Sequence, residues 1–260
     1  IIIFKLYNGG FLSKRCVGLP GDRINIKQDR VWVNNSLFRN TVGTKFGHFS
    51  ASDSDRQKEL QSMMDDPEIN TILCARGGYG LSRIVSQLDF TKIKAHPKWV
   101  IGFSDITVLH AALQNQGIQS IHGPMAAAFG KGDTGLPYIL ALKQMLEGAA
   151  QPVSANPHPA NRLGHSEGVL VGGNLCLMTH LIGSKNQLDT KGKILCIEDV
   201  GEHHYNVDRM LIQCKNAGIL DELAGLVVGG FTEMKDEAAE FGETVIEIIL
   251  RLTKEAAYPI

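Results

Sequence analysis

The chain has 260 residues, of which 43% are hydrophobic and 20% are charged, and its formal net charge is −1. This is the composition of an ordinary globular protein, long enough for one large domain or two smaller ones. The near-zero charge gives no reason to expect nucleic acid or an anionic membrane surface as a partner, and no apolar run is long enough for a membrane anchor or a signal peptide.

The cysteines are odd in number and scattered, and they form no CxxC pair. They are Cys16, Cys74, Cys176, Cys196 and Cys214. Three of the five lie in apolar runs, where a free cysteine behaves as a small hydrophobic residue. This pattern favours a reducing compartment over a disulfide framework.

Residues 1–42 are predicted to form a β-rich segment. Short strand-like runs alternate there with turn sequences such as Asn-Gly-Gly and Leu-Pro-Gly-Asp, which predicts an antiparallel meander. The expected strands are Ile1–Lys5, Phe11–Val17, Arg23–Lys27 and Val31–Asn34.

Residues 43–150 show a different pattern, in which strands and helices alternate. Such alternation predicts an α/β domain with a parallel sheet between helices. The expected strands are Thr71–Ala75, Trp99–Ile101 and Ser120–His122, and the expected helices are Asp53–Met64, one starting near Leu81, Ile106–Gln114 and Leu136–Leu146.

A proline-containing stretch over residues 151–166 is predicted to link this domain to a second α/β domain, residues 167–260. In the second domain strands and helices alternate again. The expected strands are Gly168–Val171, Ile194–Ile197 and Leu226–Gly229, and the expected helices are Leu175–Leu181, Val207–Ala217 and Glu243–Thr253.

Ser104 stands between a buried strand and a helix, within the run Trp99–His110. The apolar strand ends at Ile101, Gly102 interrupts it, and helical spacing begins at Ile106. A serine in such a turn can expose its hydroxyl while backbone N–H groups and the helix dipole point toward it. This arrangement suits a nucleophile whose tetrahedral intermediate carries negative charge, although a serine here also suits an ordinary helix N-cap.

A glycine-rich turn of sequence RGGYG starts at Arg76, between a strand and a helix. Glycines there let backbone amides face an anion, although they also serve a plain tight turn. Loops at the carboxyl ends of parallel strands meet in one crevice, so we expect Gly77 or Gly78 to donate an N–H to an oxyanion at Ser104. The N–H of Asp105 is the expected second donor. Arg76 is a candidate for holding a substrate carboxylate, or for pairing with a neighbouring acid.

A strand of the second domain ends in the acidic sequence Ile197–Glu202 (IEDVGE). A carboxylate at the end of a strand can orient a histidine in a catalytic triad, whereas a solvated loop acid is the ordinary alternative. His203 and His204 follow directly, but adjacent residues do not share one face of a helix or strand, and no HExxH spacing occurs. We therefore expect no metal site.

Taken together and in order, several motifs from about residue 46 onward resemble the LD-carboxypeptidase family of serine peptidases. They are Ala75–Gly80, Pro97–Thr107, His122–Met125, Gly172–Leu175 and Ile197–Glu202, with Tyr205 and Asp208–Leu211. The resemblance implies two α/β domains, with Ser104 as nucleophile and Glu198 as carboxylate of a Ser-His-Glu triad. It also implies removal of the terminal D-amino acid from an L,D bond in peptidoglycan tetrapeptides, during cell-wall recycling in the bacterial cytoplasm. The resemblance implies no cofactor, and it leaves open whether the protein forms a homodimer.

The chain departs from the family's pattern at its end. In the family the catalytic histidine follows the segment that Tyr258–Ile260 resembles, and none of the nine histidines of this chain matches its position. Without that base the Ser104 hydroxyl is a poor nucleophile, so we expect the chain as given to be impaired.

The second departure is at the front, where Ser13–Asp22 and Val31–Asn34 resemble a segment of type I signal peptidase. A signal peptidase fragment is therefore one alternative for the chain. A non-catalytic muropeptide-binding protein is another, because it would use the same crevice without turnover. A phosphate- or nucleotide-binding protein would depend on the RGGYG turn alone.

Overall fold

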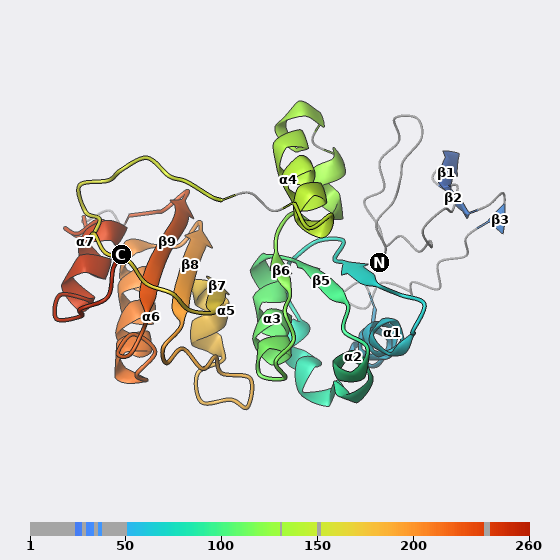
Figure 1. The fold of residues 1–260 in the computed structure, drawn as a ribbon, viewed down its shortest axis with the longest axis horizontal. Coiled ribbons are helices and arrows are strands. Elements are labelled where there is room, and N and C mark those ends of the chain that lie inside the picture. The colour runs from blue at the N-terminus through green and yellow to red at the C-terminus, as the bar shows by residue number, and fades with distance from the viewer. Residues whose placement is uncertain are drawn as a thin grey trace. The chain divides into compact units, whose positions relative to one another are not determined.

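The computed structural model describes residues 24–27, 30–33, 36–37, 51–130, 132–149, 152–236 and 240–260. It divides into two units, Ile1–Pro152 and Val153–Ile260. Each unit contains a parallel three-stranded sheet flanked by helices (Figure 1). This is the α/β fold that the alternation of strands and helices predicts.

Among the described residues, a small antiparallel sheet comes first. It contains β1 (Ile24–Lys27), β2 (Arg30–Val33) and β3 (Ser36–Leu37), in that order. The predicted antiparallel meander is confirmed for the strands around residues 24–33, and β3 is an addition to it. The strands expected over residues 1–5 and 11–17, like the signal-peptidase-like residues 13–22, lie outside the described residues.

The parallel sheet of the first unit has the order β4-β5-β6. Its strands are β4 (Thr71–Leu73), β5 (Trp99–Gly102) and β6 (Ile121–His122). Leu73 pairs with Ile101, and Ile101 pairs with Ile121, so these three side chains share one face of the sheet. They form a buried cluster with Leu142 of α4 (Leu136–Leu146). Alternate residues point to the opposite face, which is buried as well.

The described part of this unit also contains the α-helices α1 (Asp53–Asp65), α2 (Thr91–Ala95) and α3 (Thr107–Gln114). The helix expected from Leu81 onward is instead two 3-10 turns, Leu81–Arg83 and Val85–Gln87. The apolar residues there do have helical spacing, which explains the expectation. Ile84 interrupts the run with a φ of −118°, and the backbone bonds join residues three apart, as in Ile84 N–H to Leu81 O.

The second unit contains a parallel sheet of order β7-β8-β9. Its strands are β7 (Leu170–Asn174), β8 (Ile194–Val200) and β9 (Gly225–Thr232), and its helices are α5 (Leu175–His180), α6 (His204–Asn216) and α7 (Val245–Leu252). Val171, Leu195 and Leu226 pair in register on one buried face of the sheet. Apolar residues of the three helices, such as Leu211 and Ile248, are buried too and complete this core.

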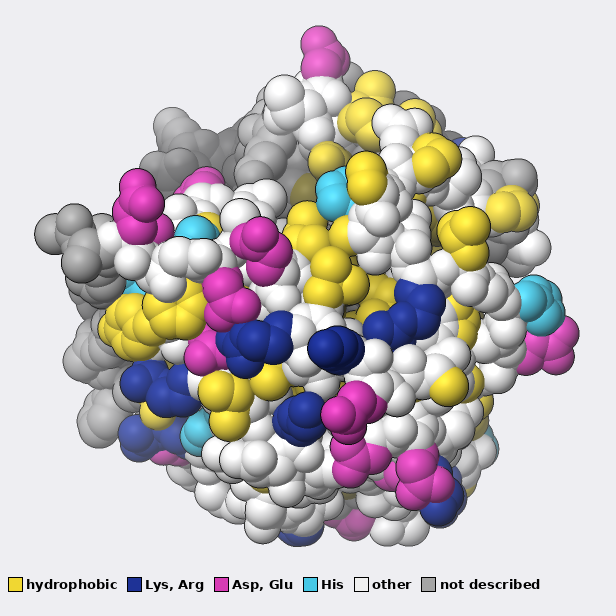
Figure 2. All heavy atoms as spheres, turned by 90° about the vertical axis from the view of Figure 1, so that its left-hand side faces the viewer, with side chains coloured by type: hydrophobic (Ala, Val, Ile, Leu, Met, Phe, Trp, Pro, Cys, Tyr) yellow, Lys and Arg dark blue, Asp and Glu magenta, His cyan; other side chains and the backbone are white. Residues whose placement is uncertain are grey.

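Acidic and basic side chains lie next to one another on the face of the molecule shown in Figure 2. Individual pairs in the second unit are close: Arg251 lies 2.7 Å from Asp208 and 2.8 Å from Glu243. No helix among the described residues is long and apolar enough to cross a membrane. The four cysteines from residue 74 onward are free thiols.

Candidate active site

Ser104 begins a 3-10 turn, Ser104–Ile106, that joins β5 to α3. Its φ is +62°, a left-handed conformation that costs a non-glycine residue about 1–2 kcal/mol. Within the part of the chain that the structure describes, Glu233 is the one other non-glycine residue with positive φ. A strained serine in a sharp strand-to-helix turn is the geometry that exposes a nucleophilic hydroxyl in hydrolases.

Gly102 lets this turn fold back over the end of β5. A Cβ at this position would lie 2.7 Å from Cγ1 of Ile106, which is too close for any side chain. The missing side chain therefore allows the first turn after Ser104 to pack directly on the strand.

The glycine-rich loop lies directly against the Ser104 side chain. A Cβ on Gly77 would lie 3.0 Å from the Ser104 Cβ and 3.2 Å from its Oγ. The loop and the serine were expected to meet because both follow parallel strands, and the structure places them in contact. The backbone of this loop is thus near enough to stabilise charge that develops beside the hydroxyl.

Replacement of Gly77 by alanine is expected to lower the catalytic efficiency of any reaction at Ser104 by about tenfold or more, because the added methyl group displaces the serine side chain. Gly117→Ala is the matched control: Gly117 has a φ of +75° and open space around it, so the substitution strains the backbone at the opposite end of α3 from Ser104. Steady-state kinetics of both variants measure the effect. Equal activities in the two variants would contradict the contact between Gly77 and the Ser104 side chain.

Arg76 and Gly78 complete the loop. Arg76 is exposed, and its Nε donates a hydrogen bond of 3.3 Å to the carbonyl of Gly77. Gly78 has a φ of +128°, a conformation that L side chains rarely adopt. The guanidinium therefore lies along the loop and faces solvent, where it can meet an anionic group.

Asp105 has a role that the sequence did not reveal. Its side chain is buried, and Oδ2 accepts a hydrogen bond of 3.1 Å from the backbone N–H of Leu81. Leu81 directly follows the glycine-rich loop, so this carboxylate ties the end of the loop to the Ser104 turn. From the sequence we predicted a role only for the backbone N–H of Asp105. The signal that could have indicated the side chain's role is an acidic residue within an apolar run.

His110 supports the ends of the neighbouring strands from within α3. Its ring is buried, with Nε2 at 2.9 Å from the carbonyl of Gly102 and Nδ1 at 2.8 Å from Oγ of Ser120. Burial lowers the pKa of His110 to about 4. Desolvation also lowers the pKa of His122, which pairs with Gly102 at the strand ends, close to the ring of Phe103.

The neutral state of His110 predicts a pH-dependent stability of the first unit. Its folded-state pKa of about 4 lies below the ordinary value of 6.5, so the unfolded chain binds more protons between these values. The contribution is therefore present above pH 6.5 and is lost as the pH falls toward 4. Between pH 7 and pH 4.5 this one group should lower the free energy of unfolding by about 2 kcal/mol.

Denaturant unfolding followed by tryptophan fluorescence measures this effect, because both tryptophans, Trp32 and Trp99, belong to the first unit. His110→Gln, which cannot take up a proton, should lose less stability than the parent over this pH range. An identical loss in the parent and in the variant would show that His110 does not titrate on unfolding.

Glu198 lies near the end of β8 in the second unit, and the structure gives it a half-buried side chain. Burial raises the pKa of this carboxyl above its ordinary value, the adjacent Asp199 raises it further, and a hydrogen bond from Asn174 lowers it. The sequence shows Asp199 beside Glu198 in the IEDVGE run, but the contact with Asn174 was not predicted, because Asn174 lies on another strand. Glu198 belongs to the second unit, whereas Ser104 and the glycine-rich loop belong to the first.

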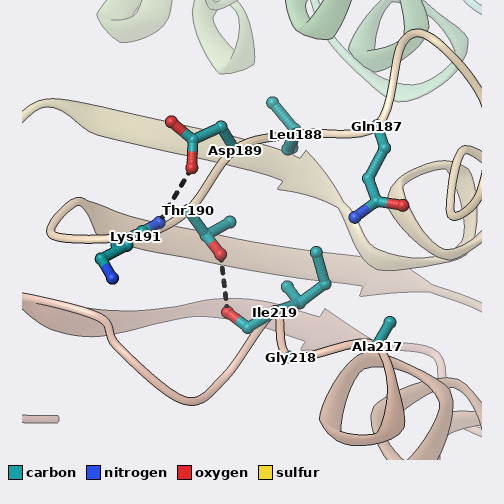
Figure 3. A pocket seen from close by; sticks show the side chains of 8 residues that line it. All are labelled: Gln187, Leu188, Asp189, Thr190, Lys191, Ala217, Gly218 and Ile219. Atoms are coloured by element: carbon teal, nitrogen blue, oxygen red, sulfur yellow. Dashed lines mark hydrogen bonds between the residues drawn. The ribbon is translucent and has the colours of Figure 1, made fainter.

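A shallow pocket of about 290 Å³ lies elsewhere in the second unit (Figure 3). It is lined by Gln187–Lys191, before β8, and by Ala217–Ile219, after α6. These residues are at the amino end of β8, whereas Glu198 is near its carboxyl end. Functional sites of parallel sheets lie at the carboxyl ends of the strands, so this pocket does not join the candidate site.

Two histidines, His203 and His204, follow β8 in the chain. His204 Nδ1 lies 3.7 Å from Oδ2 of Asp236, and His203 packs beside Tyr205. Across the described ranges, no group of three or more His, Cys, Asp or Glu side chains could hold a metal ion.

Comparison with known proteins identifies the family. Residues 24–123 match the LD-carboxypeptidase N-terminal domain, and residues 167–260 match the LD-carboxypeptidase C-terminal domain. A Synechocystis protein with a provisional carboxypeptidase name is 35% identical over 223 residues, which cover 85% of this chain and 71% of the relative. The chain belongs to the LD-carboxypeptidase family.

Two further proteins that the chain resembles support this assignment. The "Probable murein peptide carboxypeptidase" of Bacillus subtilis is 40% identical over 71% of this chain, which spans 59% of that relative's length. The crystal structure of muramoyltetrapeptide carboxypeptidase from Oxalobacter formigenes is 31% identical and has a TM-score of 0.74 over 85% of this chain and 76% of that one.

The LD-carboxypeptidase match begins earlier than the motifs suggest. It starts at residue 24, within the stretch that was expected to be foreign to the family. None of the relatives named above is a signal peptidase, and the resemblance of residues 1–38 to that family is unsupported.

Proposed function

We propose that this protein is a serine carboxypeptidase that removes the terminal D-amino acid from peptidoglycan tetrapeptides. The observation that carries the proposal is the strained Ser104 turn in contact with Gly77, in a chain of this family. The names of its relatives refer to murein peptides and muramoyltetrapeptide, which supports the same substrate class.

The proposed reaction begins at Ser104. Its Oγ attacks the carbonyl carbon of the terminal peptide bond while a histidine takes the hydroxyl proton. Backbone N–H groups of the glycine-rich loop and of Asp105 stabilise the oxyanion. The histidine then gives the proton to the leaving nitrogen, the D-amino acid departs, and water hydrolyses the acyl-serine ester.

Two other side chains have proposed roles. The Glu198 carboxylate orients the histidine and stabilises its protonated form. The Arg76 guanidinium, exposed beside the loop, binds the terminal carboxylate of the substrate. A free carboxylate at that position is what distinguishes a carboxypeptidase substrate from an internal peptide bond.

Release of D-alanine from a muropeptide tetrapeptide tests the proposal. None of the nine histidines matches the position of the family's base, so the assay uses two proteins. One is the 260-residue chain, and the other is this chain joined at its C-terminus to the corresponding end segment of the Bacillus subtilis relative, which by the family's pattern should supply the histidine. We expect the joined protein to release D-alanine at a rate far above that of the 260-residue chain.

Two outcomes would overturn the proposal. Tetrapeptide binding without any product in the joined protein would indicate a non-catalytic muropeptide-binding protein. Thermal stabilisation by nucleotides, with none by tetrapeptide, would indicate a nucleotide-binding protein instead.

A further inference from the structure

Glu198 has an amide side chain beside it on the neighbouring strand. β7 and β8 are parallel, and Asn174 pairs directly with Glu198 at their carboxyl ends. Asn174 is buried, and its side chain forms a hydrogen bond with Glu198. The amide nitrogen, Nδ2, also donates a bond of 2.9 Å to Oδ1 of Asp199. One asparagine therefore contacts two consecutive carboxylates of the same strand.

The remaining contacts fix the orientation of that amide. Oδ1 of Asn174 accepts a bond of 3.1 Å from the N–H of Leu177, as the N-cap of α5. Asp199 is buried as well, and its Oδ2 accepts a bond of 3.0 Å from the N–H of Cys176. Its Oδ1 also accepts a bond of 2.9 Å from the N–H of Val200. Both ends of the amide are thus engaged, and it cannot rotate without breaking the cap of α5.

We propose that Asn174 is a positioning residue of the reaction, which holds the Glu198 carboxylate in place so that it can orient a histidine. The inference rests on the proposed function. Asn174 acts through Glu198 and needs no contact with the substrate. The buried Asp199 anchors this arrangement to the backbone at the start of α5.

The other groups around Glu198 work against its ionisation. Burial and the negative charge of Asp199 both raise its pKa, whereas the bond from Asn174 lowers it. On the other side lies β9, residues 225–232, which carries no ionisable side chain. The nearby thiols, Cys196 on β8 and Cys176 on α5, have pKa values raised chiefly by burial, so they are neutral. Loss of the Asn174 side chain should therefore raise the pKa of Glu198.

The test is Asn174→Ser, because serine also serves as an N-cap but cannot supply the amide donor. Proteins labelled with 13C in the glutamate carboxyl are titrated by NMR, and Glu198→Gln assigns the signal of Glu198. We expect the titration midpoint of Glu198 to rise by about one pH unit, since a hydrogen bond to an ionised group is lost. Asn186→Ser, which changes a buried asparagine before β8, is the matched control and should leave the midpoint unchanged.

Asn174→Asp is the second variant in case the serine variant does not fold, because aspartate keeps both the size and the N-cap. It removes the donor and adds a negative charge, so the midpoint should rise further than in the serine variant. In the histidine-bearing joined protein, the acid limb of the pH profile of kcat/KM should also move to higher pH. An unmoved Glu198 midpoint in a folded variant would overturn the inference.

Failure of the proposed function gives a different result. A joined parent protein that releases no D-alanine overturns the proposed function and the catalytic part of this inference together. The NMR titration is read on the 260-residue chain without any turnover, so it still decides whether Asn174 keeps Glu198 ionised.

Discussion

Ser104→Ala is expected to reduce D-alanine release from a muropeptide tetrapeptide by roughly 10⁵-fold or more, that is, to background. Without Oγ no acyl-enzyme forms, and the remaining loop can only bind the substrate. The measurement is the rate of D-alanine release by the histidine-bearing joined protein and by its variant. Tetrapeptide affinity should change little, because the substitution removes one atom from the Ser104 side chain.

The control for this prediction is Ser62→Ala, which removes an exposed hydroxyl on α1 that bonds to the carbonyl of Glu59. It should retain full activity. If Ser104→Ala still released D-alanine at more than about a hundredth of the parent rate, Ser104 could not be the nucleophile.

The backbone strain at Ser104 also predicts a difference in stability between two variants of this residue. Glycine adopts positive φ without cost, so Ser104→Gly should be about 1 kcal/mol more stable than Ser104→Ala, and both should be inactive. Denaturant unfolding compares the two variants. Equal stabilities would show that the φ of +62° stores no strain.

Glu198→Gln is the second substitution with a large expected effect, a loss of roughly 10³- to 10⁴-fold in kcat. Glutamine keeps the size of the side chain but cannot stabilise a protonated histidine. KM should change much less than kcat, because the carboxylate is assigned no contact with the substrate. Steady-state kinetics of the joined protein and its variant separate these two constants.

Glu222→Gln is the control, because Glu222 is an exposed acid that pairs with Lys191 at 2.8 Å. It should leave kcat unchanged. A Glu198→Gln variant with nearly full kcat would remove this residue from the triad and leave the histidine to be oriented by another group.

The sequence predicts those parts of the fold that depend on local pattern. The run Trp99–Ile101 followed by Gly102 and Ser104 gives the strand, its break and the turn, because each depends on residues within a few positions. The same reasoning is wrong after Leu81. Apolar spacing cannot distinguish one α-helix from two 3-10 turns that bury the same side.

The support of the candidate site could not be read from local pattern, because its contacts join distant parts of the chain. The bond between Asp105 and Leu81 spans 24 residues, and that between Asn174 and Asp199 spans 25. A single sequence shows only that polar residues stand in apolar runs. It does not show which groups they meet: strand register decides this for Asn174, and the packing of two turns decides it for Asp105.

The central claim is that Ser104 is the nucleophile, and covalent trapping tests it most directly. The joined protein is incubated with a phosphonate analogue of the tetrapeptide, digested with trypsin and mapped by mass spectrometry. We predict one adduct, on Ser104 in the peptide that begins at Trp99, and none in Ser104→Ala. An adduct on another residue, or D-alanine release by a protein whose Ser104 is never modified, would contradict the account.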